Sequence, residues 1–421
     1  TSATGIDVTG EVSASQDYPN FRPTLDFNFA AERKLDPRIT YSRTGSASFV
    51  NEFGKIVLVG DNAPRFDHDP VTRESKGLLI EESRTNIAPY STDISQYTAV
   101  NATKIANDAV APDGTTTAAR MIHGGSGTSY FDHINNSINA AGAGSYTYSV
   151  WLKAPDDQPD GYYGCQIAVL HSTGGNVEPT VSLNSTWTRY TVTKTFGASD
   201  PGKLRVHIVM FRSAPGNSYG GKIIPSYVWA WGAQIEQGAF ATSYIPTAGA
   251  TRGMENVTIT DSDFTDFYNP LESTAVCEFD TSYWKAYNNN KYERIFSFGN
   301  HNTETDTFEV FKQNTSNSET RYRVRTANSN VLGAANYSYG TNTTPKVAFA
   351  LKLNDAAVTI DGGTPGGTSD TGIPMPTVTK LSLGNSGLEN NGGVHTLTGY
   401  IRRFMYYPVK LPDSQVVTLT S

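Results

Sequence analysis

The residues best suited to chemistry are a group of aromatic and amide side chains near position 285. Tyr283, Trp284 and Tyr287 stand beside a run of asparagines that includes Asn289. Apolar faces of sugar rings stack on aromatic rings, and amides take sugar hydroxyls, so this combination is typical of a glycan-binding site. The alternative is a loop whose rings cover the edge of a sheet. The sequence is equally consistent with these two roles.

A second group of aromatic residues lies in connections earlier in the chain. Tyr162, Tyr163 and Tyr219 stand in segments rich in glycine, proline and aspartate, and such loops often carry binding residues. Tryptophans in strand-like segments are instead expected to be mostly structural, because large rings dominate sandwich cores. They are Trp151, Trp187, Trp229 and Trp231. Trp229 and Trp231 share one strand face, and we expect at least one of them to be core.

Three arginines alternate along one segment of the C-terminal region. On a strand, Arg321, Arg323 and Arg325 would all lie on the same face. Because guanidinium groups bind carboxylate or sulfate with two hydrogen bonds, they are candidates for binding an acidic polysaccharide. Cross-strand pairing with Glu309 or Glu319 is the alternative. We favour the alternative, because sheets usually neutralise such rows of charge.

Three aspartates could supply hard oxygen ligands to calcium. Asp261, Asp263 and Asp266 lie close together in the sequence, but they lack the glycine and the final glutamate of an EF-hand loop. A surface linker is therefore the favoured interpretation. No cofactor is expected to be required, and calcium is the metal that the sequence leaves open.

A pair of carboxylates raises the question of catalysis. Glu278 and Asp280 share a strand face, and glycoside hydrolysis uses two carboxylates at a suitable separation. The next alternate position, which would complete a glycanase motif, is Ser282. The sequence thus predicts no catalytic residue, and we expect the chain not to be an enzyme.

Length and composition restrict the class of protein. A chain of 421 residues is long enough for about three domains. The formal net charge of −7 does not indicate the basic surface that nucleic-acid-binding proteins have. With 11% aromatic and only 17% charged residues, the profile is that of a β-rich protein with many turns. Cys165 and Cys277 are expected to be buried free thiols. We expect neither a signal peptide nor membrane insertion.

Alternation of apolar and polar residues predicts strands throughout and no helix of normal length. The clearest are 24–30, 38–43, 146–153, 166–170, 187–195, 204–211, 227–235, 273–279, 294–299, 307–312, 321–326, 380–384 and 397–407. Hairpins are expected over 49–59 and 346–360, and a last short helical turn over 412–418.

The stretch NAPRFDHDPVTRESKGLLIEESRTN, residues 62–86, is the least generic part of the chain. We expect Asp67, His68 and Asp69 to form a turn before Pro70. The apolar run 78–80 should be a buried strand, with the charges that follow it, those of Glu81, Glu82 and Arg84, pairing with one another.

With PRITYSR and FVNEFGKI before it, this stretch resembles a block found in structural proteins of tailed bacteriophages, over residues 20–91. One departure is Arg73, where the family usually has glycine. The segments YTYSVWLKA, STWTRYTVT and VWAWGAQIEQGAFATSYIPTAGAT resemble carbohydrate-binding-module sandwiches of phage tail proteins and bacterial glycanases. FALKLNDAAVTIDGG, LSLGN and LTGYIRRFMYYPVKLPDSQVVTLT resemble concanavalin A-like sandwiches of the laminin-G or pentraxin type.

The expected fold is all-β, with a small N-terminal β unit followed by two lectin-like jelly-roll sandwiches. The predicted divisions are an arm over 1–20, an N-terminal β unit for virion attachment over 21–91, a carbohydrate-binding-module-like sandwich over 92–253 and a concanavalin A-like sandwich over 254–421. We expect the N-terminal region to face the virion and the last sandwich to face outward. The resemblance allows calcium in either sandwich.

The resemblance implies a virion protein made in the bacterial host cytoplasm. It would be a tail fibre, tail appendage or capsid-surface fibre that binds host surface polysaccharide for attachment. Its other partners would be virion proteins, contacted through the N-terminal region, and further copies of itself, with a trimer expected. The alternatives are a capsid decoration protein that only reinforces the particle and, third, a polysaccharide depolymerase.

Overall fold

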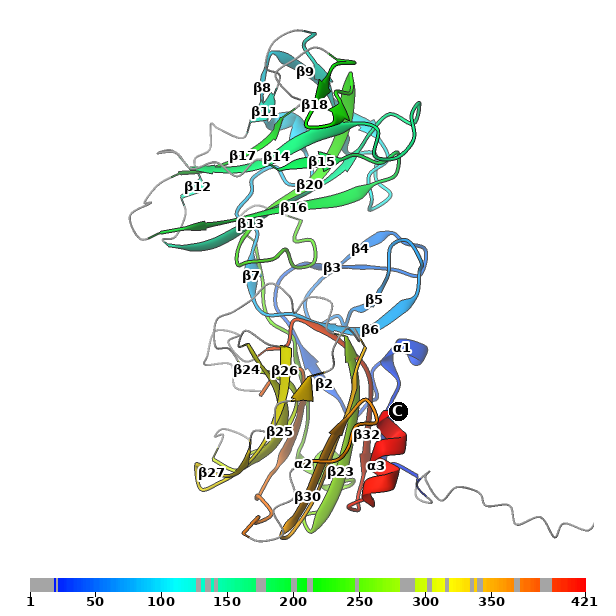
Figure 1. Cartoon of the computed structure of the whole chain (residues 1–421), viewed down its shortest axis with the longest axis vertical. Coiled ribbons are helices and arrows are strands. Elements are labelled where there is room, and N and C mark those ends of the chain that lie inside the picture. Colours follow the sequence, from blue (N-terminus) through cyan, green and yellow to red (C-terminus); the bar gives the residue numbers. More distant parts are fainter. Residues whose placement is uncertain are drawn as a thin grey trace, which may run out of the picture.

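The computed structural model describes residues 19, 22–125, 130–132, 138–139, 143–171, 179–197, 203–209, 215–246, 250–280, 292–300, 305–314, 318–333, 337–338, 344–366, 372–386 and 396–421. Over these residues the chain forms two β-sandwiches, one at each end of the molecule, with a small hairpin between them (Figure 1). The predicted all-β class is confirmed. Among the described residues, no helix is long and apolar enough to cross a bilayer.

One sandwich is formed by the central part of the chain, and we call it the middle sandwich for its place in the sequence, although it lies at one end of the molecule (Figure 1). Its five-stranded sheet has the order β16 (Thr188–Phe196), β13 (Gly144–Lys153), β20 (Tyr227–Gln237), β10 (Ala118–His123), β9 (Ala102–Ala109). Its six-stranded sheet has the order β15 (Thr180–Ser182), β14 (Gly164–His171), β17 (Lys203–Val209), β11 (Tyr130–Asp132), β8 (Thr98–Val100), with β12 (Ile138–Asn139) also on β17. The two sheets enclose a core that includes Tyr146, Tyr148, Val150 and Leu152 of β13.

The last sandwich has a seven-stranded and an eight-stranded sheet. The first has the order β30 (Asp355–Ile360), β29 (Lys346–Lys352), β23 (Glu272–Asp280), β32 (Gly399–Tyr407), β6 (Ser75–Ile80), β5 (Phe66–His68), with β1 (Leu25–Phe27) also on β32. The second has the order β2 (Thr40–Ser42), β22 (Asn256–Thr260), β31 (Lys380–Leu383), β24 (Tyr292–Gly299), β25 (Thr307–Asn314), β26 (Ser318–Thr326), β27 (Ser329–Gly333), with β28 (Tyr337–Ser338) on β26. Phenylalanines fill its core, where Phe298 stacks on Phe308 with ring centroids 4.3 Å apart.

Smaller elements connect the sandwiches. They are the pairs β3 (Ala47–Val50) with β4 (Ile56–Val59) and β7 (Arg84–Thr85) with β21 (Thr251–Arg252). A third pair, β18 (Ser218–Tyr219) with β19 (Lys222–Ile223), lies in the middle sandwich, where Ile223 bridges Tyr163. The helices are α1 (Phe29–Glu32), α2 (Asp261–Thr265), α3 (Asp413–Thr420) and the 3-10 turn η1 (Ile94–Gln96). The predicted hairpin over 49–59 corresponds to β3 and β4, and α3 lies where a final helical turn was predicted.

The N-terminal strands do not form a unit of their own. In the seven-stranded sheet, Leu25 of β1 lies opposite Tyr406 and Ile80 of β6 lies opposite Gly399. β2 joins the other sheet through β22. The predicted separation of residues 21–91 from the last sandwich is thus wrong for these strands. It follows that the N-terminal strands and the last sandwich lie at the same end of the molecule (Figure 1).

The expected turn at Asp67 and His68 is also corrected, because both residues belong to strand β5. Asp67 is buried, and its carboxylate accepts hydrogen bonds from the Tyr400 hydroxyl at 2.7 Å and from the Val50 amide. The turn instead begins at Asp69, whose side chain accepts two backbone amides. Within it, Arg73 has a φ of 64°, a left-handed conformation that glycine adopts at no steric cost. This is the position where the phage block usually has glycine.

A buried ion network joins the two sandwiches. The side chain of Arg65 lies 2.8 Å from Glu81 and 2.5 Å from Glu255. Arg252 also binds Glu81, at 2.9 Å, and Arg43 approaches Glu255 at 3.4 Å. All five side chains are fully buried. We call Arg43, Arg65, Glu81, Arg252 and Glu255 the junction network.

Hydrogen bonds from the middle sandwich and from the backbone of the junction itself complete the network. The backbone amide and hydroxyl of Ser243, at the end of the middle sandwich, donate to Glu81 at 2.7 and 2.6 Å. The Glu81 amide donates to Glu255 at 2.7 Å. Of the predicted pairing among the charges after the buried strand, only that of Arg84 with Glu82 is present. Glu81 pairs with arginines distant in sequence instead.

Loss of one charge from the junction network should destabilise the protein strongly. Glu255→Gln leaves Arg65 and Arg43 buried with less negative charge, so we expect the free energy of unfolding to fall by about 3–5 kcal/mol. Urea denaturation followed by circular dichroism measures it. Asp26→Asn is the control, because its pair with Arg403 is 40% and 39% exposed and should contribute less than about 1 kcal/mol. Equal, small losses in both variants would contradict the assigned role of the network.

Glu81 should also make stability depend on pH. Burial alone would raise the pKa of Glu81, but the charges of Arg252 and Arg65 outweigh it and lower the pKa to about 2. Its stabilisation is therefore present above the ordinary pKa of 4.5 and is lost as the pH falls towards about 2. Between these values, the melting temperature of the wild type should fall more steeply than that of Glu81→Gln. Parallel curves would show that Glu81 does not titrate in this way.

Candidate functional site

The five-stranded sheet of the middle sandwich has one face in the core and one face turned outward. On β20, Val228 and Ala230 point into the core. By alternation, Tyr227, Trp229 and Trp231 lie on the outer face. Three aromatic rings therefore follow one another along the outside of a central strand.

One half of this outer face is covered. Trp231 is fully buried, with its ring 4.7 Å from Tyr244 and 5.5 Å from Trp151, and its indole N–H donates to Thr117 at 3.0 Å. Ile56 of the β3–β4 hairpin belongs to the same cluster. This half of the face is a structural contact between the middle sandwich and the junction, as expected for at least one of the two tryptophans.

The other half carries the candidate site. Tyr227 and Trp229 are half-buried and meet edge to face, with centroids 4.9 Å apart. The Trp229 indole N–H donates to Asp108 Oδ2 at 2.8 Å, and Arg120 binds Asp108 Oδ1 at 3.0 Å. Lys153 lies opposite Trp229 in the strand register. We call Asp108, Arg120, Lys153, Tyr227 and Trp229 the aromatic–cation patch.

Cations are held against both rings of the patch. The Arg120 guanidinium lies 5.3 Å from the Tyr227 centroid, and the Lys153 ammonium lies 5.2 Å from that of Trp229. Cation–π attraction of this kind is worth about 0.5–1 kcal/mol at exposed sites. The patch thus combines apolar ring surface, fixed hydrogen-bond donors and one carboxylate on a rigid sheet.

Two of the loop tyrosines predicted from sequence, Tyr162 and Tyr163, contact each other, and Tyr163 is near enough to Tyr227 of the patch to interact with it electrostatically. Tyr162 is 43% exposed and meets Tyr163 edge to face at 5.2 Å. Burial, followed by Asp157, raises the pKa of Tyr163, and Tyr227 of the patch contributes to the same shift. Tyr163 is held partly by the core, so Tyr162 is the more accessible of the two. Of the third predicted tyrosine, Tyr219, the structure describes the backbone in β18 but not the side chain.

The sequence candidates Tyr283, Trp284, Tyr287 and Asn289 lie outside the described residues. They remain predictions.

The arginine row is at least partly structural. Arg323 lies directly opposite Glu309 and forms an ion pair with it, and Arg294 binds the same carboxylate at 2.9 Å. Arg325 binds Asn328, and Arg321 lies opposite Phe311. Arg323 is therefore not a free anion site, because a buried glutamate faces it across the strands.

The aspartates considered for calcium do not form a ligand set. Asp261 and Asp263 lie in helix α2 and Asp266 follows it. Asp261 has a φ of 55°, so it does not continue the regular turn that carries Asp263 and Asp266. Within the part of the chain that the structure describes, no group of three or more His, Cys, Asp or Glu could hold a metal ion.

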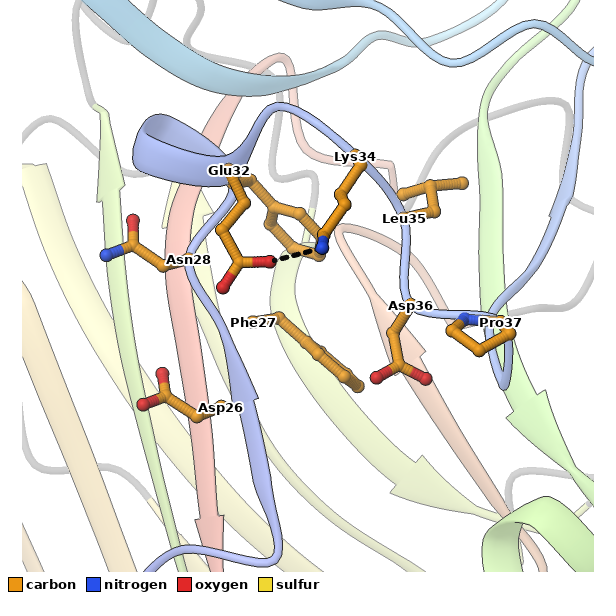
Figure 2. A pocket seen from close by; sticks show the side chains of 9 residues that line it. Asp26, Phe27, Asn28, Glu32, Lys34, Leu35, Asp36 and Pro37 are labelled. Carbon is orange, nitrogen blue, oxygen red and sulfur yellow. Dashed lines mark ion pairs between the residues drawn. The ribbon is translucent and has the colours of Figure 1, made fainter.

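A separate cavity of about 290 Å³ lies beside α1 at the edge of the last sandwich (Figure 2). Its walls are Asp26, Phe27, Asn28, Phe29, Glu32, Lys34, Leu35, Asp36 and Pro37. Glu32 and Lys34 point toward one another, with an N–O distance of 3.5 Å (Figure 2). Asp26 and Asp36 are paired with arginines outside the cavity wall. All four charged side chains of the wall thus have ionic partners, so they do not point to a ligand.

From sequence, no binding role is predicted for Asp108, Arg120 or Lys153, and Trp229 is expected to be more structural than functional. The signal for the patch was present in YVWAW, where three aromatic residues alternate with small apolar ones. Such alternation places the rings on one face of a strand and the core contacts on the other. What was missing was the strand order that brings Arg120 and Lys153 to either side of Trp229.

No model of a known protein family and no curated protein matches the chain. Similar solved structures include the CBM40 of Ruminococcus gnavus IT-sialidase bound to alpha2,3 sialyllactose, with a TM-score of 0.31, 16% identity and coverage of 38% of this chain and 89% of that one. The Trypanosoma rangeli sialidase in complex with the inhibitor DANA has a TM-score of 0.30 and 10% identity, with coverage of 55% of this chain and 42% of that one. Domains LG4-5 of the mouse laminin alpha1 chain have a TM-score of 0.25 and 8% identity, with coverage of 80% of this chain and 94% of that one. Likenesses this low do not bear on what the chain binds.

The two neighbouring tryptophans of β20 should differ in their effect on stability. Trp231→Ala removes a fully buried ring and should lower the free energy of unfolding by about 3–5 kcal/mol. Trp229→Ala removes a half-buried ring, so its cost should be roughly 1–2 kcal/mol. Urea denaturation followed by circular dichroism compares the two. If both variants lose the same stability, Trp229 is as structural as Trp231 and the division of the face is wrong.

Proposed function

We propose that this chain is a structural protein of a tailed-bacteriophage virion that binds host surface glycan without covalent chemistry. The aromatic–cation patch is the observation that carries the binding part of the proposal. The virion part is supported by the resemblance of residues 20–91 to a block of phage structural proteins. In this proposal the protein is not an enzyme.

Sugar recognition at the patch would use two kinds of contact. The rings of Tyr227 and Trp229 offer apolar surface for the C–H face of a sugar, a contact that needs no fixed hydroxyl pattern. Arg120 would supply hydrogen bonds to sugar oxygens, and Tyr162, a 43% exposed residue in the neighbouring loop, could add another through its hydroxyl. Because Asp108 fixes both the Trp229 indole and Arg120, these groups need little reordering when a ligand arrives.

The arrangement of the molecule suggests an orientation on the particle. The N-terminal strands lie in the sheets of the last sandwich, and the middle sandwich lies at the other end (Figure 1). We therefore propose that the middle sandwich, rather than the last one, faces the host. The N-terminal region and last sandwich would contact other virion proteins and neighbouring copies in a symmetric oligomer.

Binding of the full-length protein to an array of bacterial surface polysaccharides, followed by calorimetry with those that bind, tests the proposal. Trp229→Ala and Tyr227→Ala should each weaken binding by about tenfold or more, because each removes a ring at the centre of the contact. Phe53→Ala is the matched control, since Phe53 is 66% exposed on the β3–β4 turn, outside the patch.

Other outcomes would contradict the proposal in different ways. If only Tyr283→Ala and Trp284→Ala weaken binding, the glycan site is the one predicted from sequence in the last sandwich. Release of oligosaccharide would indicate a depolymerase. Absence of binding, with the protein retained on emptied particles, would favour reinforcement of the capsid.

A further inference from the structure

Lys153 is the charged group of the patch whose interactions are least complete. It is the last residue of β13, half-buried, and its ammonium lies 5.2 Å from the Trp229 ring centroid. Across the described residues, no carboxylate lies within ion-pair distance of it. An ammonium group has three donors and is strongly hydrated, so a π contact alone leaves it with unused hydrogen-bonding capacity.

The one carboxylate of the patch is already in use. Asp108 Oδ2 accepts the Trp229 indole N–H, and Oδ1 accepts Arg120. The patch contains two cations, Arg120 and Lys153, and one anion, so its formal charge is +1. Exposed Asp156 and Asp157 follow in the next loop, so the positive charge is confined to the two rings. A cation held at the rings favours an anionic ligand there.

We propose that the patch is selective for an acidic glycan, and that Lys153 determines this by binding the carboxylate of a uronic-acid-type sugar. The inference rests on the proposed glycan binding at the same patch. One sugar ring would stack on Tyr227 or Trp229, which are nearly perpendicular to each other, and its carboxylate would supply an ionic partner for Lys153. Bringing an anion to a partly dehydrated cation gains more than bringing a neutral hydroxyl, since charge-assisted hydrogen bonds are roughly twice as strong.

The chain contains a matched control for Lys153. Lys194 of β16 is also half-buried and also lies over an aromatic ring, 5.4 Å from the Phe196 centroid. In the strand register it lies opposite Tyr146, seven residues before Lys153 on β13, which places it roughly 20 Å away. Lys153→Gln and Lys194→Gln thus make the same change in charge beside an aromatic ring. Lys194 shares the inner face of its strand with Phe196, and only Lys153 is in the patch.

The experiment is calorimetric titration of the full-length protein with two forms of one ligand. They are a bacterial polysaccharide that contains glucuronate and the same polymer after its carboxylates have been reduced to alcohols. The wild type should bind the acidic form at least about fivefold more tightly. Lys153→Gln should remove that preference, Lys153→Arg should keep most of it, and Lys194→Gln should leave it unchanged. Rising salt should weaken binding of the acidic form in the wild type more than in Lys153→Gln.

The results separate this inference from the proposed function. If both polymers bind equally well and Trp229→Ala abolishes both, the patch binds glycan but selectivity for acid is overturned. If Lys194→Gln changes the preference as much as Lys153→Gln, the effect is one of overall charge and the assignment to Lys153 is overturned. Failure of the wild type to bind the acidic polymer overturns this inference, whereas the proposed function is overturned only if no polysaccharide of the array is bound.

Discussion

The arrangement of this protein depends on a buried set of charges that must remain paired. Arg65 contacts Glu81 and Glu255 with no solvent exposure, and Arg252 shares Glu81. A buried charge without a partner is strongly destabilising, so the segments that supply these side chains are held to one arrangement. They come from the N-terminal strands, from the end of the middle sandwich and from the start of the last one. The network therefore joins the two sandwiches as well as stabilising each.

The same junction decides how much of the outer sheet face is left for binding. The β3–β4 hairpin and the loop with Tyr244 cover Trp231 but stop short of Trp229. The uncovered half keeps two rings at its surface, and Asp108 orders them through the Trp229 indole. Structural packing and the candidate site are thus two parts of one continuous surface, and the position of the site follows from where the covering segments end.

Several features followed from local sequence. Alternation predicted most strands, and the turn residues predicted both hairpins, including the one at Asn354, which adopts a φ of 59°. Cys165 and Cys277 are buried and free, as expected for two isolated thiols. The Arg323–Glu309 pair was the favoured interpretation of the arginine row. By contrast, the turn expected at Asp67 is a strand, because a buried hydrogen bond from Tyr400, more than 300 residues away, holds it.

By itself, the sequence determined which residues share a face, since the side-chain period of a strand is two. It thereby determined the all-β class and the row formed by Tyr227, Trp229 and Trp231. Only the tertiary structure decided that Trp231 is buried and Trp229 is not, and that β1 and β6 pair with β32 instead of with each other. The physical reason is that burial of a face and choice of a strand partner depend on segments far apart in the chain. The local alternation of apolar and polar residues carries no information about those contacts.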